Sequence, residues 1–223
     1  MGSYETTIGI LEDELTRVEQ VFAGLSPDEW RAPTKLVPVD PGLPRWTVFE
    51  LAGHFDISIG LTRILIDGRD DSRPARDRTS FFINPRSETA PVVYDYAYTM
   101  VRGKTPADMP GALHETFSMT LSQARSVPAD TVGPGYFAPM RADEFVASRI
   151  VEAVVHGIDL TQALGRAPIA TTDGIKITAD ILDDLLARRT VGRRPPELSN
   201  DLDWIMTASG RLPFEDNRLP IIG

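Results

Sequence analysis

Three histidines and one glutamate are the residues of this 223-residue sequence whose types and spacing best suit metal chemistry. The histidines are His54, His114 and His156, and Glu152 lies four residues before the last of them. In a helix that spacing places the two side chains side by side, with their Cβ atoms about 6 Å apart, so that they could share one ion. Two imidazoles and one carboxylate with an open fourth position are the ligand set of catalytic zinc, and they also suit other divalent transition metals.

A helix is expected over residues 48–67 to position His54. Thr47 and Glu50 form a capping box at its start, and Gly68 is a typical helix stop. At about 100° per residue, His54 lies on the apolar face of this helix and therefore points into the protein. A core histidine satisfied by one polar partner is the commoner explanation of such a residue, so His54 alone does not establish a metal site. The other residues on the apolar face that carries His54 are Leu51, Ser58, Leu61 and Leu65.

A second helix, over about 141–164, should carry the other two candidate ligands. Beyond its first turn its charged residues are Arg149, Glu152 and Asp159, which lie with His156 in a sector about 80° wide. Most of the remaining circumference is apolar, far more than the stripe of about 100° on a surface helix, so the polar sector should line an internal cleft. A carboxylate there needs a partner, because an unpaired buried charge costs several kcal/mol. A metal ion and a buried polar network are both open explanations.

Three residues near these candidates have alternative roles. Arg149, one turn before Glu152, could pair with that carboxylate or bind an anionic substrate. Asp159, one turn after His156, could accept the second ring proton of that histidine or be a solvated residue near the helix end. His114 has no comparable neighbour in the pattern, and we expect a structural role for it.

The rest of the sequence predicts mainly helices. Long helical segments dominate residues 1–165, which indicates a helix bundle, and residues 167–223 form a smaller appendage. The stretches 69–88 and 127–139 are expected to be loops, the first of them exposed, and the alternating tyrosines within 89–101 fit a helix or a strand. Further helices are expected over about 4–25, 173–189 and 200–209, and from after Pro110-Gly111 to about 126. A single short helical turn should follow Ser26, which forms a capping box with Glu29.

Composition narrows the classes of partner. Lys and Arg total 23 against 32 for Asp and Glu, which gives a formal net charge of -9 and an isoelectric point near 4.8. This field repels nucleic acid and anionic membranes, so neither is expected as a partner, and the basic run 188–194 is interpreted as a solvated helix end. No stretch has the ~20 apolar residues of a membrane span, and the acidic first 25 residues do not resemble a secretory signal, so we expect a cytoplasmic protein. Because the sequence contains no cysteine, any reacting thiol would have to arrive as a ligand.

Three stretches together carry a family resemblance. They are RWTVFELAGH at 45–54, RIVEAVVHGIDLTQALG at 149–165 and SGR at 209–211. On these motifs the chain resembles the mycothiol-dependent maleylpyruvate isomerase family within the DinB-like superfamily, over most of its length. One departure is Pro44-Arg45-Trp46, where the family commonly has Pro-Gly-Trp, and a second is the short tail after Arg211. Both departures concern the substrate rather than the metal.

The resemblance implies a mainly α fold. Residues 1–165 would form a DinB-like four-helix bundle that binds metal, and residues 167–223 a small helical or α/β appendage that completes the cleft. The resemblance also implies a divalent metal, with zinc as the first expectation, held by His54, Glu152 and His156.

The same resemblance implies roles for other residues in the motifs. Trp46 and Arg211 would bind the substrate, and Arg211 would take part in catalysis, although a surface position for Arg211 stays open. A catalytic role is also expected for Arg149, from its place one turn before Glu152. Asp159 would orient the metal-binding histidine that precedes it in the helix. Mycothiol would be the cosubstrate, in agreement with the lack of cysteine in the chain.

The implied function is activation of a low-molecular-weight thiol by the metal, followed by reaction with a small electrophile. A stable thioether would be the transferase outcome, and an adduct that rotates and expels the thiol would be the isomerase outcome. A metal-dependent hydrolase and a non-catalytic DinB-like binding module remain open alternatives. A monomer and a homodimer are equally compatible with the sequence, which does not name the electrophile.

Overall fold

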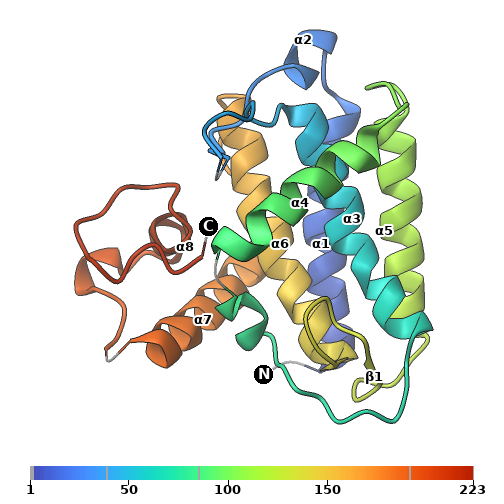
Figure 1. Ribbon diagram of the computed structural model, residues 1–223, viewed down its shortest axis with the longest axis vertical. Helices are drawn as coiled ribbons and strands as arrows, with labels where there is room; N and C mark the ends of the chain where they lie inside the picture. The colour runs from blue at the N-terminus through green and yellow to red at the C-terminus, as the bar shows by residue number, and fades with distance from the viewer. Residues whose placement is uncertain (1–2, 39, 85, 191, 223) are drawn as a thin grey trace.

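The computed structural model describes residues 3–38, 40–84, 86–190 and 192–222. Four long helices form a bundle in which α1 and α3 each pack against both α5 and α6 (Figure 1). The prediction of a mainly helical bundle is confirmed. The four helices are α1 (Tyr4–Ala23), α3 (Val48–Asp67), α5 (Met109–Arg125) and α6 (Ala142–Ala163).

Local hydrogen bonds determine where the chain enters α3. Both predicted capping boxes are present: Ser26 with Glu29 opens the short helix α2 (Pro27–Trp30), and Thr47 with Glu50 opens α3. In each box the hydroxyl accepts a backbone N–H of the first turn and the glutamate accepts the N–H of the cap residue. The bounds of α3 agree with the predicted ones, so the register of this helix is set by neighbouring residues alone.

The helix α4 (Arg86–Val101) crosses α3 obliquely on one side of the bundle (Figure 1). Sequence patterning left a helix and a strand open for this segment, and the structure shows a helix. Gly53 of α3 permits the close crossing, because a Cβ atom at this position would lie 2.5 Å from the backbone oxygen of Ala97. The crossing places tyrosines of α4 beside the part of α3 that carries His54.

Two segments that were expected to be loops contain short elements of secondary structure. The stretch 69–88 includes the short 3-10 helix η1 (Ser80–Ile83), in which Phe81 is buried and packs edge-on against Phe145. The expectation of an exposed loop is wrong there, because the contact joins residues far apart in sequence. Within 127–139, the strand β1 (Val132–Gly133) pairs antiparallel with β2 (Met140–Arg141), directly before α6.

The start of α5 also differs from the prediction. We expected regular helix only after Pro110-Gly111, but α5 begins at Met109. Pro110 lies in the first turn, where its missing N–H would have had no partner within the helix, so proline is tolerated at this position.

Where it is described, the C-terminal region contains two α-helices that pack on the bundle, and its last described residues, 209–222, form turns and irregular chain. The helix α7 (Thr172–Arg189) contacts α6 and α1, and α8 (Asp201–Ala208) contacts α7 and α6 (Figure 1). The short 3-10 helix η2 (Pro196–Leu198) precedes α8. The division between residues 1–165 and 167–223 is not tested by these contacts and stays a prediction.

Arginines at and just after the end of α7 form ion pairs, of which the one made by Arg188 joins this region to the rest of the protein. Arg188 pairs with Asp77, and Arg194 pairs with Asp183 and Asp201. Arg188, Arg189 and Arg193 stay exposed, in agreement with the interpretation of this run as a solvated helix end, although the ion pair of Arg188 with Asp77 joins residues far apart in sequence.

The helix α6 is buried around nearly its whole circumference, as predicted from its sequence. Residues of α1, α3, α7 and α8 surround it, so its polar side chains face the protein interior. Among the described residues, no helix is both long and apolar enough to cross a membrane.

Candidate metal centre

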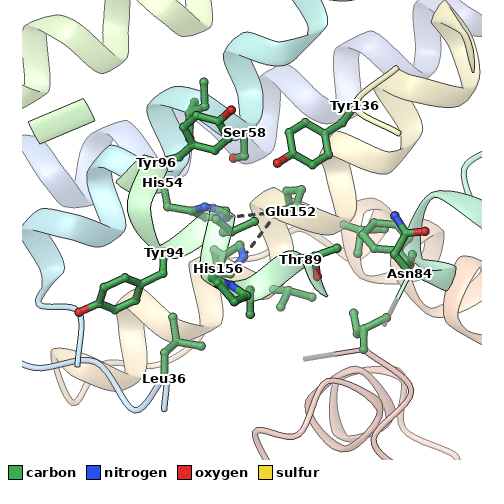
Figure 2. Close-up of a pocket in the computed structure, with 18 of the residues that line it drawn as sticks. Leu36, His54, Ser58, Asn84, Thr89, Tyr94, Tyr96, Tyr136, Glu152 and His156 are labelled. Atoms are coloured by element: carbon green, nitrogen blue, oxygen red, sulfur yellow. Dashed lines mark hydrogen bonds and ion pairs between the residues drawn. The ribbon is translucent and has the colours of Figure 1, made fainter. Parts of the chain in front are cut away.

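Three predicted ligands converge at one point between α3 and α6. The Nε2 atom of His54 lies 3.3 Å from Oε2 of Glu152, and the Nε2 atom of His156 lies 3.4 Å from the same oxygen (Figure 2). One ligand atom from each residue lies within 4.8 Å of the other two. The imidazole rings are 4.3 Å apart at their centroids and nearly perpendicular. The structure thus brings together two nitrogens and one carboxylate from helices that are distant in sequence.

Burial and charge give these groups different protonation states. Burial opposes the charge on Glu152, but hydrogen bonds with His156 and His54 and the nearby Arg149 outweigh it and hold the pKa of this carboxyl well below its usual value. Burial, together with the charges of His156 and Arg149, lowers the pKa of His54 and favours its neutral form. Burial also lowers the pKa of His156, but the carboxylates of Asp159 and Glu152 outweigh it and raise that pKa overall.

The hydrogen-bond pattern around His156 is suited to a cation between the three ligands. The Nδ1 atom of His156 lies 2.8 Å from Oδ2 of Asp159, so a neutral ring donates its one proton to that carboxylate. The Nε2 atom then presents a lone pair to the carboxylate oxygen of Glu152, and two lone pairs repel unless a proton or a metal ion lies between them. The Nδ1 atom of His54 is buried without a hydrogen-bond partner, so this ring has only one engaged nitrogen. This donor set fits a divalent transition metal.

Asp159 is held by an arginine from the C-terminal region. Arg211 donates from Nε and Nη2 to the two oxygens of Asp159, over 2.9 and 2.6 Å, and from Nη1 to the backbone oxygen of Ser209. Burial opposes the charge on Asp159, but Arg211 and His156 outweigh it and lower the pKa of this carboxyl to about 2. An ion pair, Arg211 with Asp159, is therefore connected to the ring of a candidate metal ligand.

Arg149 lies beside the centre as a fully buried cation. Its guanidinium lies between the rings of Phe81 and Phe145, 4.5 and 4.6 Å from their centroids. It donates to the backbone oxygen of Ser58 and to the hydroxyl of Ser148, while its Nη2 atom lies 4.0 Å from Glu152. Burial lowers the pKa of Arg149 to about 10, so it remains charged at neutral pH. The charge acts on Glu152 through space rather than through a hydrogen bond.

The centre lies in a cavity of about 430 Å³. Trp46 lies over His54 with 5.3 Å between the ring centroids and stacks on Tyr94 on its other side. Figure 2 shows Tyr94, Tyr96 and Tyr136 arranged around the three ligands. Each of the site residues predicted from the sequence lines this cavity except Asp159, which lies behind His156.

Sequence reasoning missed part of the cavity wall. Tyr94 and Tyr96 of α4 and the aromatic residues of the two predicted loops line the cavity, but none of them was among the site residues expected from the sequence. The only feature of the sequence that could have indicated these lining residues was the high density of aromatic side chains in their segments. His114 lies apart from the site: its side chain is exposed and contacts Glu19 on the surface of the bundle.

Comparisons with known proteins identify the family of the chain and solved structures with the same fold. The family model described as the mycothiol maleylpyruvate isomerase N-terminal domain matches residues 11–161. Two solved structures share the fold: the mycothiol-dependent maleylpyruvate isomerase, with TM-score 0.57 and 13% identity, and a variant of it with a histidine replaced by alanine, with TM-score 0.58 and 12% identity. Each similarity covers 83% of this chain and 70% of the other. A search of curated proteins found no significant match. With about two thirds of its length matched by the family model, the chain belongs to the mycothiol maleylpyruvate isomerase N-terminal domain family.

Proposed function

We propose that the chain is a metal-dependent enzyme that activates a low-molecular-weight thiol for reaction with a small electrophile. The thiol is mycothiol, and the outcome is S-transfer or thiol-assisted isomerisation. The observation that carries the proposal is the convergence of His54, Glu152 and His156 in the wall of a cavity large enough for a substrate. Family membership supports mycothiol as the thiol, and the solved structures that share the fold have this dependence in their names.

The metal would be held by His54, Glu152 and His156, with zinc as the first expectation. When bound there, a divalent cation supplies the positive charge that lowers the pKa of a thiol below its ordinary value of roughly 8.5. The chain contributes no cysteine of its own, so the reactive sulfur belongs to the cosubstrate.

The surrounding side chains orient the ligands. Asp159 accepts the Nδ1 proton of His156 and thereby directs the Nε2 lone pair toward Glu152. Arg211 holds both oxygens of Asp159, which keeps that carboxylate charged and fixed. We therefore propose that Arg211 acts through Asp159. Its direct binding of substrate, as the family resemblance implies, stays a prediction.

Arg149 places a permanent positive charge beside the reacting groups. Because it is buried and lies against two aromatic rings, this charge is not screened by water. Negative charge that develops on a substrate in the cavity would be stabilised by it, which is the catalytic role that we propose for Arg149. Trp46 covers His54 and presents a flat apolar surface to the substrate.

We also propose that residues 167–223 complete the cleft of the bundle. Arg211 and Ile221 from this region line the same cavity as the three ligands from α3 and α6. The C-terminal region thus contributes both to the cavity wall and to the ion pair behind His156.

The experiment is a product analysis by mass spectrometry with the metal-loaded protein, mycothiol and candidate electrophiles, maleylpyruvate among them. A transferase product gains the mass of the thiol, whereas an isomerase product keeps the mass of the substrate and forms only when thiol is present. His156→Ala is the control and should form neither product. Equal turnover with all thiols removed, with a gain of the mass of water, would instead support the hydrolase.

A further inference from the structure

We infer that the cavity selects an uncharged aromatic electrophile rather than a small anionic one. The inference rests on the proposed function for the reaction, but the preference for a neutral aromatic ligand is a property of the cavity itself. Three features carry it: the aromatic wall, the engaged arginines, and the apolar mouth.

The wall of the cavity consists largely of aromatic rings. Trp46 and Tyr94 are stacked at 22° on one side of the three ligands. On another side, Phe137 contacts Tyr136 and Phe81, with centroid separations of 4.6 and 5.4 Å. Flat aromatic surfaces bind a flat aromatic ligand by offset or edge-on contact in addition to the area that they bury.

The arginines in the wall are already bound by the protein. Arg149 and Arg211 each donate from three nitrogens to protein acceptors. Arg189 of α7 donates from Nη1 and Nη2 to three backbone carbonyls. Among the described residues that line the cavity there is no lysine. The carbonyls bound by Arg189 belong to Phe82, Ile83 and Ile221.

In Arg149 and Arg211 these contacts occupy the Nε and Nη2 edge, which would otherwise bind a carboxylate ligand with two parallel hydrogen bonds. A carboxylate is bound strongly when a guanidinium offers two parallel N–H groups, and in Arg211 the Nε and Nη2 pair is taken by Asp159. Asp40, an exposed acid in the cavity wall, adds repulsion. Moving a carboxylate from water into an apolar site without such a partner is costly, whereas a neutral ring has no such cost.

The mouth of the cavity is apolar as well. Val37, Leu43 and Tyr96 line the cavity and are among the large hydrophobic residues that stay most exposed, at 54%, 40% and 41%. Apolar side chains that gather at a pocket while exposed mark a surface that a ligand covers. A cavity of about 430 Å³ lies in the range that encloses a drug-sized ligand, so the ligand can extend from the three metal-binding side chains to these residues.

A matched pair of electrophiles tests the inference. Methyl 4-chloro-3,5-dinitrobenzoate and 4-chloro-3,5-dinitrobenzoate share the ring and leaving group but differ by one negative charge. The thiol sulfur forms a bond to the chlorine-bearing carbon, the C–Cl bond breaks, chloride leaves with the bonding electrons, and the thiol proton goes to solvent. We expect kcat/KM, divided by the uncatalysed rate constant with the same thiol, to be at least about tenfold higher for the ester. An equal or higher value for the acid would overturn the inference.

A binding measurement separates this inference from the proposed function. Methyl 3,5-dinitrobenzoate and 3,5-dinitrobenzoate have no leaving group, so calorimetric titration without thiol measures affinity alone. The protein is first freed of metal with a chelator, because a carboxylate would otherwise bind an open metal position rather than the cavity wall. We expect at least about tenfold tighter binding of the ester. Tighter binding of the ester by a protein that fails to catalyse thiol transfer would refute the proposed function and support the cavity preference. Equal or tighter binding of the acid would refute the preference even if transfer occurs.

A pair of variants locates the preference in the cavity. Tyr96→Arg adds a free cation at the mouth and should narrow the ratio of the ester and acid affinities by several-fold. Ile64→Arg is the matched control, since Ile64 is 54% exposed on α3 but does not line the cavity. Both variants change the net charge equally. An identical change in the ratio for both would show that net charge sets the preference, and would overturn the assignment to the cavity wall.

Discussion

Two glutamates in different parts of the bundle show how partners decide the charge state of a carboxylate. Glu152 on α6 faces two imidazoles and the guanidinium of Arg149, and its pKa is lowered although its side chain is only 15% exposed. Glu14 on α1 is buried and accepts hydrogen bonds from the hydroxyl and backbone N–H of Thr171. Burial raises the pKa of Glu14, because these hydrogen bonds only partly offset the loss of water.

The opposite pKa shifts of Glu152 and Glu14 fit different roles for the two carboxylates, one at a candidate ion site and one in a structural contact. Ion binding requires a charged carboxylate, and the nearby imidazoles and Arg149 keep Glu152 charged. Glu14 attaches the start of α7 to α1, and a neutral carboxyl still accepts hydrogen bonds in that role. Gly174 of α7 leaves room for it, since a Cβ atom there would lie 2.1 Å from the carboxylate oxygen. Burial of an acid alone is therefore a weak indication of a functional site.

The largest expected effect is the loss of metal when Glu152 is neutralised. Glu152→Gln should weaken metal binding by more than about a hundredfold, beyond the loss expected for an outer hydrogen-bond partner. Elemental analysis after dialysis measures this, and His156→Ala should behave in the same way. Glu14→Gln is the matched control and should retain one metal per chain. Stoichiometric metal in Glu152→Gln would remove the proposed ligand set.

Removal of the ion pair between Arg211 and Asp159 should cause the next largest loss of metal affinity. Asp159→Asn and Arg211→Gln should each weaken metal binding by roughly 10- to 100-fold, because both act on the orientation of the same ring. The double variant should lose little more than either single variant, since the two residues form one unit. Titration with a competing chelator gives these affinities. A raised KM in Arg211→Gln with unchanged metal affinity would show that Arg211 binds the substrate directly.

A methyl group added at Gly174, beside Glu14, should lower the stability of the protein without changing its metal content. Gly174→Ala should decrease the free energy of unfolding by about 1–3 kcal/mol, as overpacking does, because the new methyl collides with Glu14. Gly9→Ala is the control: a Cβ atom at Gly9 in α1 meets nothing within 4 Å, so this change should stabilise the helix by up to about 1 kcal/mol. Urea unfolding measures both, and equal effects would contradict the proposed contact.

The smallest expected effect is a pH dependence of stability due to Glu14. Its folded-state pKa is raised above the ordinary value of 4.5, so the folded protein holds this proton more tightly than the unfolded chain. The stabilisation is fully present below that ordinary value and is lost as pH rises through the folded pKa. The free energy of unfolding of the wild type should therefore fall relative to Glu14→Gln between pH 4 and 7. A constant difference across this range would show that Glu14 has an ordinary pKa in the folded protein.

The sequence was most informative where neighbouring residues act on one another. The capping boxes at Ser26 and Thr47 and the bounds of α3 follow from hydrogen bonds within a few residues. The pairing of Glu152 with His156 follows from helix geometry, and the burial of α6 follows from its apolar circumference. These features depend on backbone geometry that is the same in any helix, so the sequence determined them by itself.

Only the tertiary structure decided which distant residues meet at the site. Arg211 meets Asp159 across 52 positions, Arg149 reaches the backbone of Ser58 across 91, and Arg189 binds carbonyls of η1 and of the C-terminal tail. Phe81 was expected in an exposed loop and lies in the cavity wall. These contacts arise from the packing of whole helices against each other, which fixes side-chain positions by shape and burial over the entire protein. Local hydrogen bonds carry no information about that packing, so the sequence by itself indicated the three candidate ligands, and only the tertiary structure decided which residues surround them.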